Sequence, residues 1–180
     1  LRDAVRLLAL PDSIVLSESF AAELDVADGH HLMLSLDGRP VKRLDARLKT
    51  GQPDQLAVWD TTIGDVFARA VFLHPPASLE VVIPASGPGR LTTALAVHPD
   101  AWAHADACAC VFSINVDDAV AGTVILDPVR RPADRRWIEW SAEVTASATG
   151  RHRLTLETQG IDHATYGWAL FRDVTFKADA

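Results

Sequence analysis

Two stretches of the sequence gather side chains that could do chemistry, and the first is "HPDAWAHADACAC", residues 98–110. Its even positions carry only His, Asp, Trp and Cys, and its odd positions from Ala101 to Ala109 are all alanine. Alternate side chains of an extended strand share one face. The pattern would therefore place nitrogen, oxygen and sulfur donors, which bind transition metals, in one row.

Distance argues against one metal site in this row. At about 3.3 Å per residue the stretch spans roughly 40 Å, so its ends cannot converge, and Pro99 interrupts the strand. Cys108 and Cys110 continue the face of Phe112 and Ile114. We therefore expect two buried thiols acting as small apolar side chains, with no transition metal. We expect no disulfide between them, because parallel side chains two residues apart strain the bond.

The second stretch is "DPVRRPADRRW", residues 127–137, which packs four arginines into a chain whose net charge is −7. Pro128 and Pro132 fix φ and stiffen the loop. Asp127 and Asp134 can each accept paired N–H bonds from an arginine. These features favour a self-bridged loop structured by Asp127, Asp134 and Arg135, in which Arg135 is the expected partner of Asp134.

The alternative for this loop is a ligand site. Arg130 and Arg131 at its tip would contact an anionic glycan or lipid headgroup, and Trp137 beside the loop would stack on a sugar ring. Trp102 is a further aromatic candidate for the same ligand. A charged loop on a common fold is not in itself a site, so the self-bridged loop is favoured.

The carboxylates outside these two stretches would suit calcium, because calcium binds hard oxygen ligands. Asp117 and Asp118 are the candidate ligands of such a structural ion, although their spacing alone does not bring further ligands to them. No nucleophile elbow, zinc-protease, dinucleotide or phosphate-loop motif occurs, and "ASGPGR" lacks the Lys-Ser/Thr of a phosphate loop. The sequence predicts no enzyme and no cofactor other than this calcium.

Apolar residues along most of the chain recur with period two, which is typical of strands. About ten short strands with Gly/Pro punctuation predict an all-β, antiparallel sandwich of jelly-roll type. Strands are expected at 30–36, 40–48, 66–73, 78–84, 90–97, 108–116, 122–127, 137–144, 152–158 and 167–176. The expected common core is Phe112, Ile114, Trp140, Leu154, Leu156 and Trp168. If strands 137–144 and 152–158 form a hairpin, Glu143 faces Arg151 or Arg153. In a jelly roll the two strands lie in opposite sheets, and this pairing does not form.

The length of 180 residues and the hydrophobic content of 48% indicate one large domain. Residues 1–12 have a weak helical pattern and are expected to form a linker, a short helix or an extended appendage, and residues 13–180 a single sandwich domain. No apolar run has the 18 or more residues of a membrane span, and no secretory signal pattern occurs. The acidic balance excludes a nucleic-acid binder, which needs a basic face.

Residues 66–177 carry a family resemblance. The succession of "HPPASLEVVIP", "GRLTTALAVHPDAW", "LDPVRRPADRRWIEWSAEV" and "YGWALFRDVTF" resembles a bacterial jelly-roll domain similar to carbohydrate-binding modules. Such domains occur as extracytoplasmic parts of cell-surface and membrane-anchored proteins, including multi-span glycosyltransferases. The resemblance implies a periplasmic or cell-surface module tethered to a membrane protein, and no enzyme activity.

Two functions fit this resemblance. One is glycan binding as an accessory module of a cell-surface protein. The other is a structural ectodomain that contacts subunits of a membrane-associated complex. Exposed aromatic residues in one concave groove would favour the first function, and a flat apolar patch would favour the second.

Overall fold

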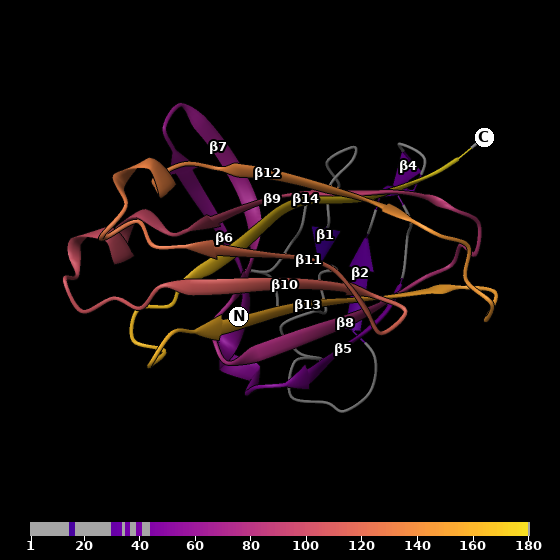
Figure 1. Cartoon of the computed structure of the whole chain (residues 1–180), viewed down its shortest axis with the longest axis horizontal. Coiled ribbons are helices and arrows are strands. Elements are labelled where there is room, and N and C mark those ends of the chain that lie inside the picture. The colour runs from indigo at the N-terminus through magenta and orange to yellow at the C-terminus, as the bar shows by residue number, and fades with distance from the viewer. Residues whose placement is uncertain (1–14, 17–29, 34, 37–38, 41–43, 180) are drawn as a thin grey trace.

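The protein is a sandwich of two β-sheets (Figure 1), seen here in a computed structural model that describes residues 15–16, 30–33, 35–36, 39–40 and 44–179. Sheet A has the order β1(Val15–Leu16), β2(His30–Met33), β5(Leu44–Thr50), β8(Ala77–Ile83), β13(His152–Gly160), β10(Cys110–Val116) and β11(Ala119–Leu126). The expected all-β, antiparallel jelly-roll sandwich is confirmed. The appendage expected at residues 1–12 lies outside the described residues.

Sheet B has the order β12(Ile138–Val144), β9(Gly89–Val97), β14(Ala169–Ala178), β3(Ser35–Leu36) and β4(Arg39–Pro40). The hairpin of β6(Leu56–Ile63) and β7(Val66–Leu73) joins it where β7 pairs with the start of β14. All pairs are antiparallel except the short β14–β3 contact. Short 3₁₀ turns lie at η2(Pro53–Gln55), η3(Pro99–Ala103) and η4(Pro132–Asp134). None of the helical segments in the described ranges has the length and apolar content of a bilayer-spanning helix.

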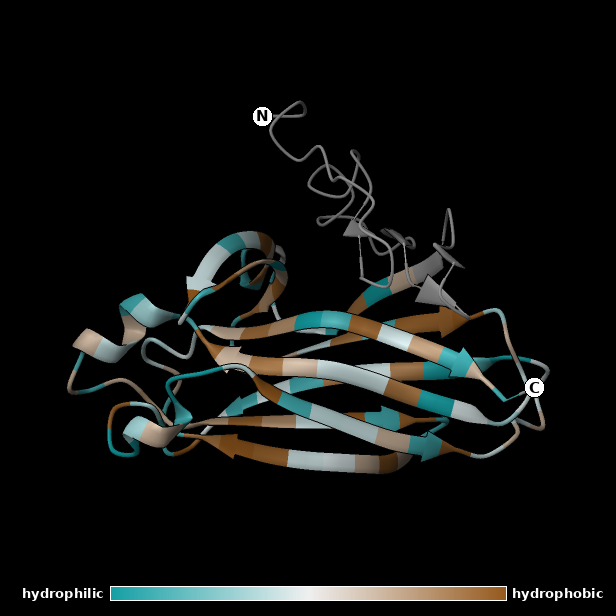
Figure 2. Cartoon of the chain, turned by 90° about the horizontal axis from the view of Figure 1, so that it is seen from above, coloured by the Kyte–Doolittle hydropathy of each residue, from teal (hydrophilic) through white to brown (hydrophobic). Residues whose placement is uncertain are grey.

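The core lies between the two sheets, which Figure 2 shows edge-on with hydrophobic and hydrophilic residues alternating along the strands. Four of the expected core residues, Phe112, Ile114, Leu154 and Leu156, are at most 1% exposed and pack together. Cys108 and Cys110 are buried in the same cluster as free thiols, as expected.

Two of the expected core residues, Trp140 and Trp168, are only half-buried. Trp140 lies on β12, the edge strand of sheet B, and its indole covers Gly122 on β11, the edge strand of sheet A. A Cβ at Gly122 would lie 2.5 Å from Trp140 Nε1, so the glycine makes room for the ring. The indole therefore closes the open edge of the sandwich instead of filling its centre. Trp168 precedes β14 and joins an aromatic cluster described below.

The strands β12 and β13 lie in opposite sheets, although only a short loop connects them. β12 pairs with β9, and β13 pairs with β8 and β10. Glu143 consequently faces Arg90 of β9, with 2.9 Å between Arg90 Nε and Glu143 Oε1. The jelly-roll alternative is confirmed, and the hairpin pairing of Glu143 with Arg151 or Arg153 is wrong.

The difference in burial between Phe112 and Trp140 gives a stability prediction. Phe112→Ala is expected to lower the free energy of unfolding by about 3–5 kcal/mol, because it empties a closed part of the core. Trp140→Ala should cost less, since its indole is half-exposed and the cavity opens to water. Urea denaturation of both variants measures this, and an equal or larger loss for Trp140→Ala would contradict the assigned faces.

Candidate functional site

The outward face of sheet A carries a row of polar side chains across its central strands. On β8 the inward residues Leu79 and Val81 are apolar, and Glu80 between them points outward. In the strand register Glu80 lies opposite Arg47 of β5 and Thr155 of β13. Thr155 in turn lies opposite Asn115 of β10. Four strands thus contribute one side chain each to a continuous polar row.

A hollow of about 730 Å³ opens over the Thr155 and Asn115 end of this row. We call it the sheet A groove; its lining is Lys49, Thr50, Gly51, Gln52, Gln55, Pro76, Ser78, Asn115, Asp118, Thr155, Glu157 and Gln159. None of these residues is aromatic, so this groove does not have the exposed aromatic residues expected for glycan binding. The side chains are mainly hydroxyls, amides and carboxylates, which makes the groove a surface for hydrogen bonding and not for ring stacking.

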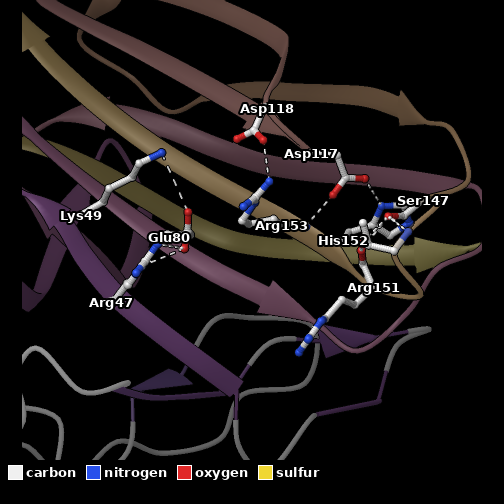
Figure 3. Close-up of polar contacts among 10 residues, drawn as sticks. Arg47, Lys49, Glu80, Asp117, Asp118, Ser147, Arg151, His152 and Arg153 are labelled. Atoms are coloured by element: carbon white, nitrogen blue, oxygen red, sulfur yellow. Dashed lines mark hydrogen bonds and ion pairs between the residues drawn. The ribbon is translucent and has the colours of Figure 1, made fainter.

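A buried carboxylate of the polar row lies beside the groove and is paired with two exposed cations. The side chain of Glu80 is 7% exposed, and its carboxylate lies 2.9 Å from Arg47 Nη2 and 3.9 Å from Lys49 Nζ (Figure 3). Two cations thus neutralise a carboxylate that would be costly to bury alone. By contrast, the side chains of Asn115 and Thr155 make no hydrogen bond within the part of the chain that the structure describes. Their polar groups are available to a ligand.

A second hollow, of about 870 Å³, adjoins the groove and shares Asp118 with it. We call it the loop hollow, because the β10–β11 turn and the β12–β13 loop line much of it. Arg153 Nη2 donates to Asp118 Oδ2 at the boundary between the two hollows. Both side chains are largely exposed, at 46% for Arg153 and 67% for Asp118.

A fully buried histidine anchors the floor of the loop hollow. His152 Nδ1 lies 2.8 Å from Asp117 Oδ2, and its Nε2 lies 2.8 Å from the carbonyl oxygen of Gly87. A carbonyl and a carboxylate only accept hydrogen bonds, so each ring nitrogen faces an acceptor of the protein and neither is open to a ligand. Asp117 Oδ1 also accepts a bond from the backbone N–H of Arg153 at 2.8 Å. His152 therefore connects three segments at this end of the sandwich.

This Asp–His pair has the geometry of the orienting half of a hydrolase triad. The second nitrogen of His152, however, is occupied by a backbone carbonyl, and the ring has no exposed surface. It offers no base to a substrate. Burial acts to raise the pKa of Asp117, but the hydrogen bonds from His152 and from the Arg153 backbone outweigh it and hold this pKa below its ordinary value.

The calcium ligands expected at Asp117 and Asp118 are turned toward cationic and N–H donors. Asp117 bonds His152 and the Arg153 backbone, and Asp118 pairs with the Arg153 guanidinium. The residues in the described ranges include no group of three metal-ligating side chains. Calcium needs six to eight oxygen ligands, and this donor set does not fit it.

The row expected along residues 98–110 does not form, because η3 turns the chain at its start. His98 is placed with its ring 5.1 Å from that of Trp59, while His104 stacks on Tyr166 with ring centroids 3.7 Å apart. The hydrogen bond between the thiols lowers the pKa of Cys108, and the same bond, reinforced by burial, raises that of Cys110. The two histidines and the two cysteines thus pack in separate parts of the fold and do not form one site.

An aromatic cluster that the sequence patterns did not reveal includes Trp59, Phe72, His98, His104, Tyr166 and Trp168. Trp59 stacks on Phe72 at 3.9 Å, and Trp168 meets Trp59 edge-on at 5.8 Å. Burial lowers the pKa of His98 against the opposing effect of Asp100. Several of these rings pack over a small apolar cluster of Ile63, Ala70, Phe72, Ala96 and Leu170.

The 127–137 loop is bridged from within, but with a different pairing from the expected one. Arg131 pairs with Asp134 at 2.8 Å, and Arg130 pairs with Asp127 at 3.3 Å. Asp134 Oδ2 also accepts the backbone N–H of Asp127 at 2.8 Å. Arg135 Nε instead donates to the carbonyl of Pro128 at 2.7 Å, so the expected Arg135–Asp134 pair is wrong.

The four ligand candidates of the sequence, Arg130, Arg131, Trp102 and Trp137, lie outside the sheet A groove. Trp102 Nε1 donates to the Val97 carbonyl at 3.0 Å, and the guanidinium of Arg135 lies 5.8 Å from its ring. Trp137 lies under Arg172 at 4.9 Å. Both tryptophans are half-buried against the small apolar cluster, where they cover it.

Comparison with known proteins gives a fold and no family. No family model and no curated protein matches the chain. A solved structure of the CBM51-2 and INT domains of Clostridium perfringens ZmpB has 12% identity and a TM-score of 0.52, covering 81% of this chain and 31% of that one. The chain thus spans about a third of the length of that ZmpB structure. This likeness assigns the fold as a jelly roll of the carbohydrate-binding-module type.

Two further structures are similar at lower scores. One is the CBM51 of Clostridium perfringens GH95 in complex with methyl-galactose, at 12% identity and a TM-score of 0.44, covering 72% of this chain and 86% of that one. The other is TmCBM61 in complex with β-1,4-galactotriose, at 13% identity and a TM-score of 0.45, covering 76% and 88%.

The buried thiols give a labelling prediction. Cys108 and Cys110 are 2% and 0% exposed, so a thiol reagent should modify them only after denaturation, despite the lowered pKa of Cys108. Labelling with a chromogenic disulfide in native buffer and in urea measures this. Rapid reaction of the native protein, or stoichiometric zinc in the purified protein, would contradict the assignment.

The Asp117–His152 pair gives a pH prediction. The pKa of Asp117 is lowered in the fold, so its ionised form contributes to the free energy of unfolding. This contribution is complete above the ordinary carboxyl pKa of about 3.9 and is lost as the pH falls through the lowered value. Asp117→Asn should cost about 1.5–3 kcal/mol at neutral pH, the range for hydrogen bonds to charged groups. The difference in free energy of unfolding between Asp117→Asn and the wild type should shrink in acid. Urea denaturation at a series of pH values measures it.

Asp118→Asn is the matched control, because it removes the neighbouring carboxylate from an exposed ion pair. It should change stability by less than about 1 kcal/mol at any pH. Equal costs for the two substitutions, or a cost for Asp117→Asn that persists in acid, would contradict the stabilising role of the Asp117–His152 pair.

Proposed function

We propose that the chain is a non-catalytic glycan-binding module, accessory to an extracytoplasmic cell-surface protein, and that the glycan binds in the sheet A groove. The observation that carries this proposal is an open polar hollow of about 730 Å³ on the face of a rigid sheet. A jelly roll similar to CBM51-2 of ZmpB supports the same class of function. The proposal includes one sandwich domain over residues 13–180.

The chemistry of the groove suits sugar hydroxyls, each of which donates and accepts hydrogen bonds. The Asn115 amide and the Thr155 hydroxyl have no side-chain partner in the described structure, and the Glu157 carboxylate accepts only one bond, from Gln159 at 3.1 Å. The neighbouring Glu80 lies outside the groove and is paired with two cations, so it does not compete for the ligand. The unpartnered groups lie on adjacent strands and require no rearrangement to bind.

The way in which four ionisable side chains near the groove are used supports a non-catalytic role. The Asp117–His152 pair is closed off by the Gly87 carbonyl, and the carboxylates of Glu80 and Asp118 are paired with arginines. General acid–base catalysis needs a group that reaches the substrate with a free proton or lone pair. These groups instead stabilise the sheet that presents the groove.

The second candidate function is a structural ectodomain that contacts partner subunits of a membrane complex. It is favoured by the tip of the β6–β7 hairpin, where Phe67 is 68% exposed and Val66 is 37% exposed. Exposed apolar side chains of this size are candidates for a protein interface. In this function the hairpin, and not the groove, would carry the interaction.

Glycan-array screening with three proteins tests the proposal. The wild type should bind one class of glycan, and the double substitution of Asn115 and Glu157 by Ala should reduce that binding at least tenfold at an unchanged melting temperature. Substituting Arg130 and Arg131 by Ala is the matched control and should retain binding. Loss of binding in the control alone would place the site at the 127–137 loop, and a wild type that binds no glycan would overturn the proposal.

A further inference from the structure

We infer that the glycan is a linear oligosaccharide that lies along β8 and β13 and occupies the sheet A groove and the loop hollow together. This inference rests on the proposed function and names its ligand class. It contrasts with a module that holds one terminal sugar, for which either hollow alone would suffice.

The two hollows form one continuous track. They share Asp118, and both run over the outward residues of β13, from Gln159 in the groove to Arg153 in the loop hollow. These two residues are six steps apart on one strand, or about 20 Å, the length of about four pyranose rings. A linear chain could therefore contact both hollows at once.

The junction of the track is an ion pair that can yield to a ligand. Arg153 and Asp118 are both substantially exposed, and an ion pair of this kind adds little to stability. The guanidinium of Arg153 offers hydrogen-bond donors and the carboxylate of Asp118 offers acceptors to sugar hydroxyls. The pair is therefore expected to contact the middle of the oligosaccharide and not to separate two binding sites.

The far end of the track presents an arginine that has no ion-pair partner in the described part of the chain. Of the charged side chains that line the loop hollow, five are paired: Glu80, Asp117, Asp118, Glu143 and Arg153. Arg151 is exposed and makes no ion pair with any residue that the structure describes. Figure 3 shows its side chain extending away from Asp117 and Asp118.

The loop that presents Arg151 is ordered by its own hydroxyl groups. Ser147 Oγ and Thr149 Oγ1 both donate to the Arg151 carbonyl, at 2.7 and 2.9 Å, and the backbone N–H of Ser147 donates to the Ser86 carbonyl at 2.8 Å. These bonds fix the backbone of Arg151, and its side chain makes no ion pair with the residues that the structure describes. A ligand has to order this side chain, so its contacts must exceed that entropy cost.

Calorimetric titration with oligosaccharides of increasing length tests the inference. The probes are cello-, xylo- and β-1,4-galacto-oligosaccharides of two to six units. For the series that binds, affinity should rise at least tenfold from the disaccharide to the tetrasaccharide and then level off. An affinity that does not change with length would overturn the inference and leave the proposed function intact, whereas no binding by any series or on the array would overturn the function itself.

Arg151→Ala separates the two hollows. It should remove most of the gain between disaccharide and tetrasaccharide while leaving disaccharide binding unchanged, because the short ligand fits within the groove. Arg136→Ala is the matched control, an exposed arginine outside both hollows, and should bind like the wild type. Full tetrasaccharide affinity in Arg151→Ala, at an unchanged melting temperature, would contradict the inference.

Discussion

The alternation of side chains along β8 and β13 is the constraint on which the rest of the structure depends. The inward residues of these two strands, among them Leu79, Val81, Leu154 and Leu156, have no exposed surface and form the centre of the core. The alternate residues point the other way; Ser78, Thr155 and Glu157 among them line the groove, and Glu80 lines the neighbouring loop hollow. A shift of one residue in register would exchange the two sets, placing Glu80 and Thr155 in the core and leucines in water. The packing of the core thus fixes the polar face.

The end of the sandwich near the loop hollow is stabilised by charge as well as by apolar packing. His152 takes an inward position on β13 beside Phe176, where a leucine would be expected from its neighbours. Its two hydrogen bonds reach the β10–β11 turn and the loop before β9, so a single ring connects sheet A to both. Breaking one partner of a buried charged pair is costly, because the other charge is left unpaired in the interior. This connection, made by two residues of the lining, holds the loop hollow in shape.

The sequence was sufficient for those features that depend on local pattern. Period-two alternation identified most strands, the inward faces of β10 and β13 and the buried cysteines, because each is a property of one strand. The assignment of β12 and β13 to different sheets was left open, since local pattern does not choose between a hairpin and a crossover. Trp140 and Trp168 share the apolar pattern of core residues, but one closes an edge and the other precedes its strand, and no strand pattern shows that.

Features built from distant segments were not accessible to the sequence. The groove needs the register that puts Arg47, Glu80, Thr155 and Asn115 in one row, and these residues are far apart in the chain. The aromatic cluster likewise joins Trp59 to Trp168. Inside the 127–137 loop the residues were known but the partners were not, because η4 turns Arg131 toward Asp134 and Arg135 toward a carbonyl.

The central claim is that the polar face of sheet A binds a glycan. Chemical-shift mapping by NMR, with isotope-labelled protein and the oligosaccharide that binds best, tests it most directly. The account predicts that the largest shifts occur at Asn115, Thr155, Glu157 and Gln159, with smaller ones at the 127–137 loop. The largest shifts at Trp102, Trp137 and the 127–137 loop, with the sheet A groove unmoved, would contradict it.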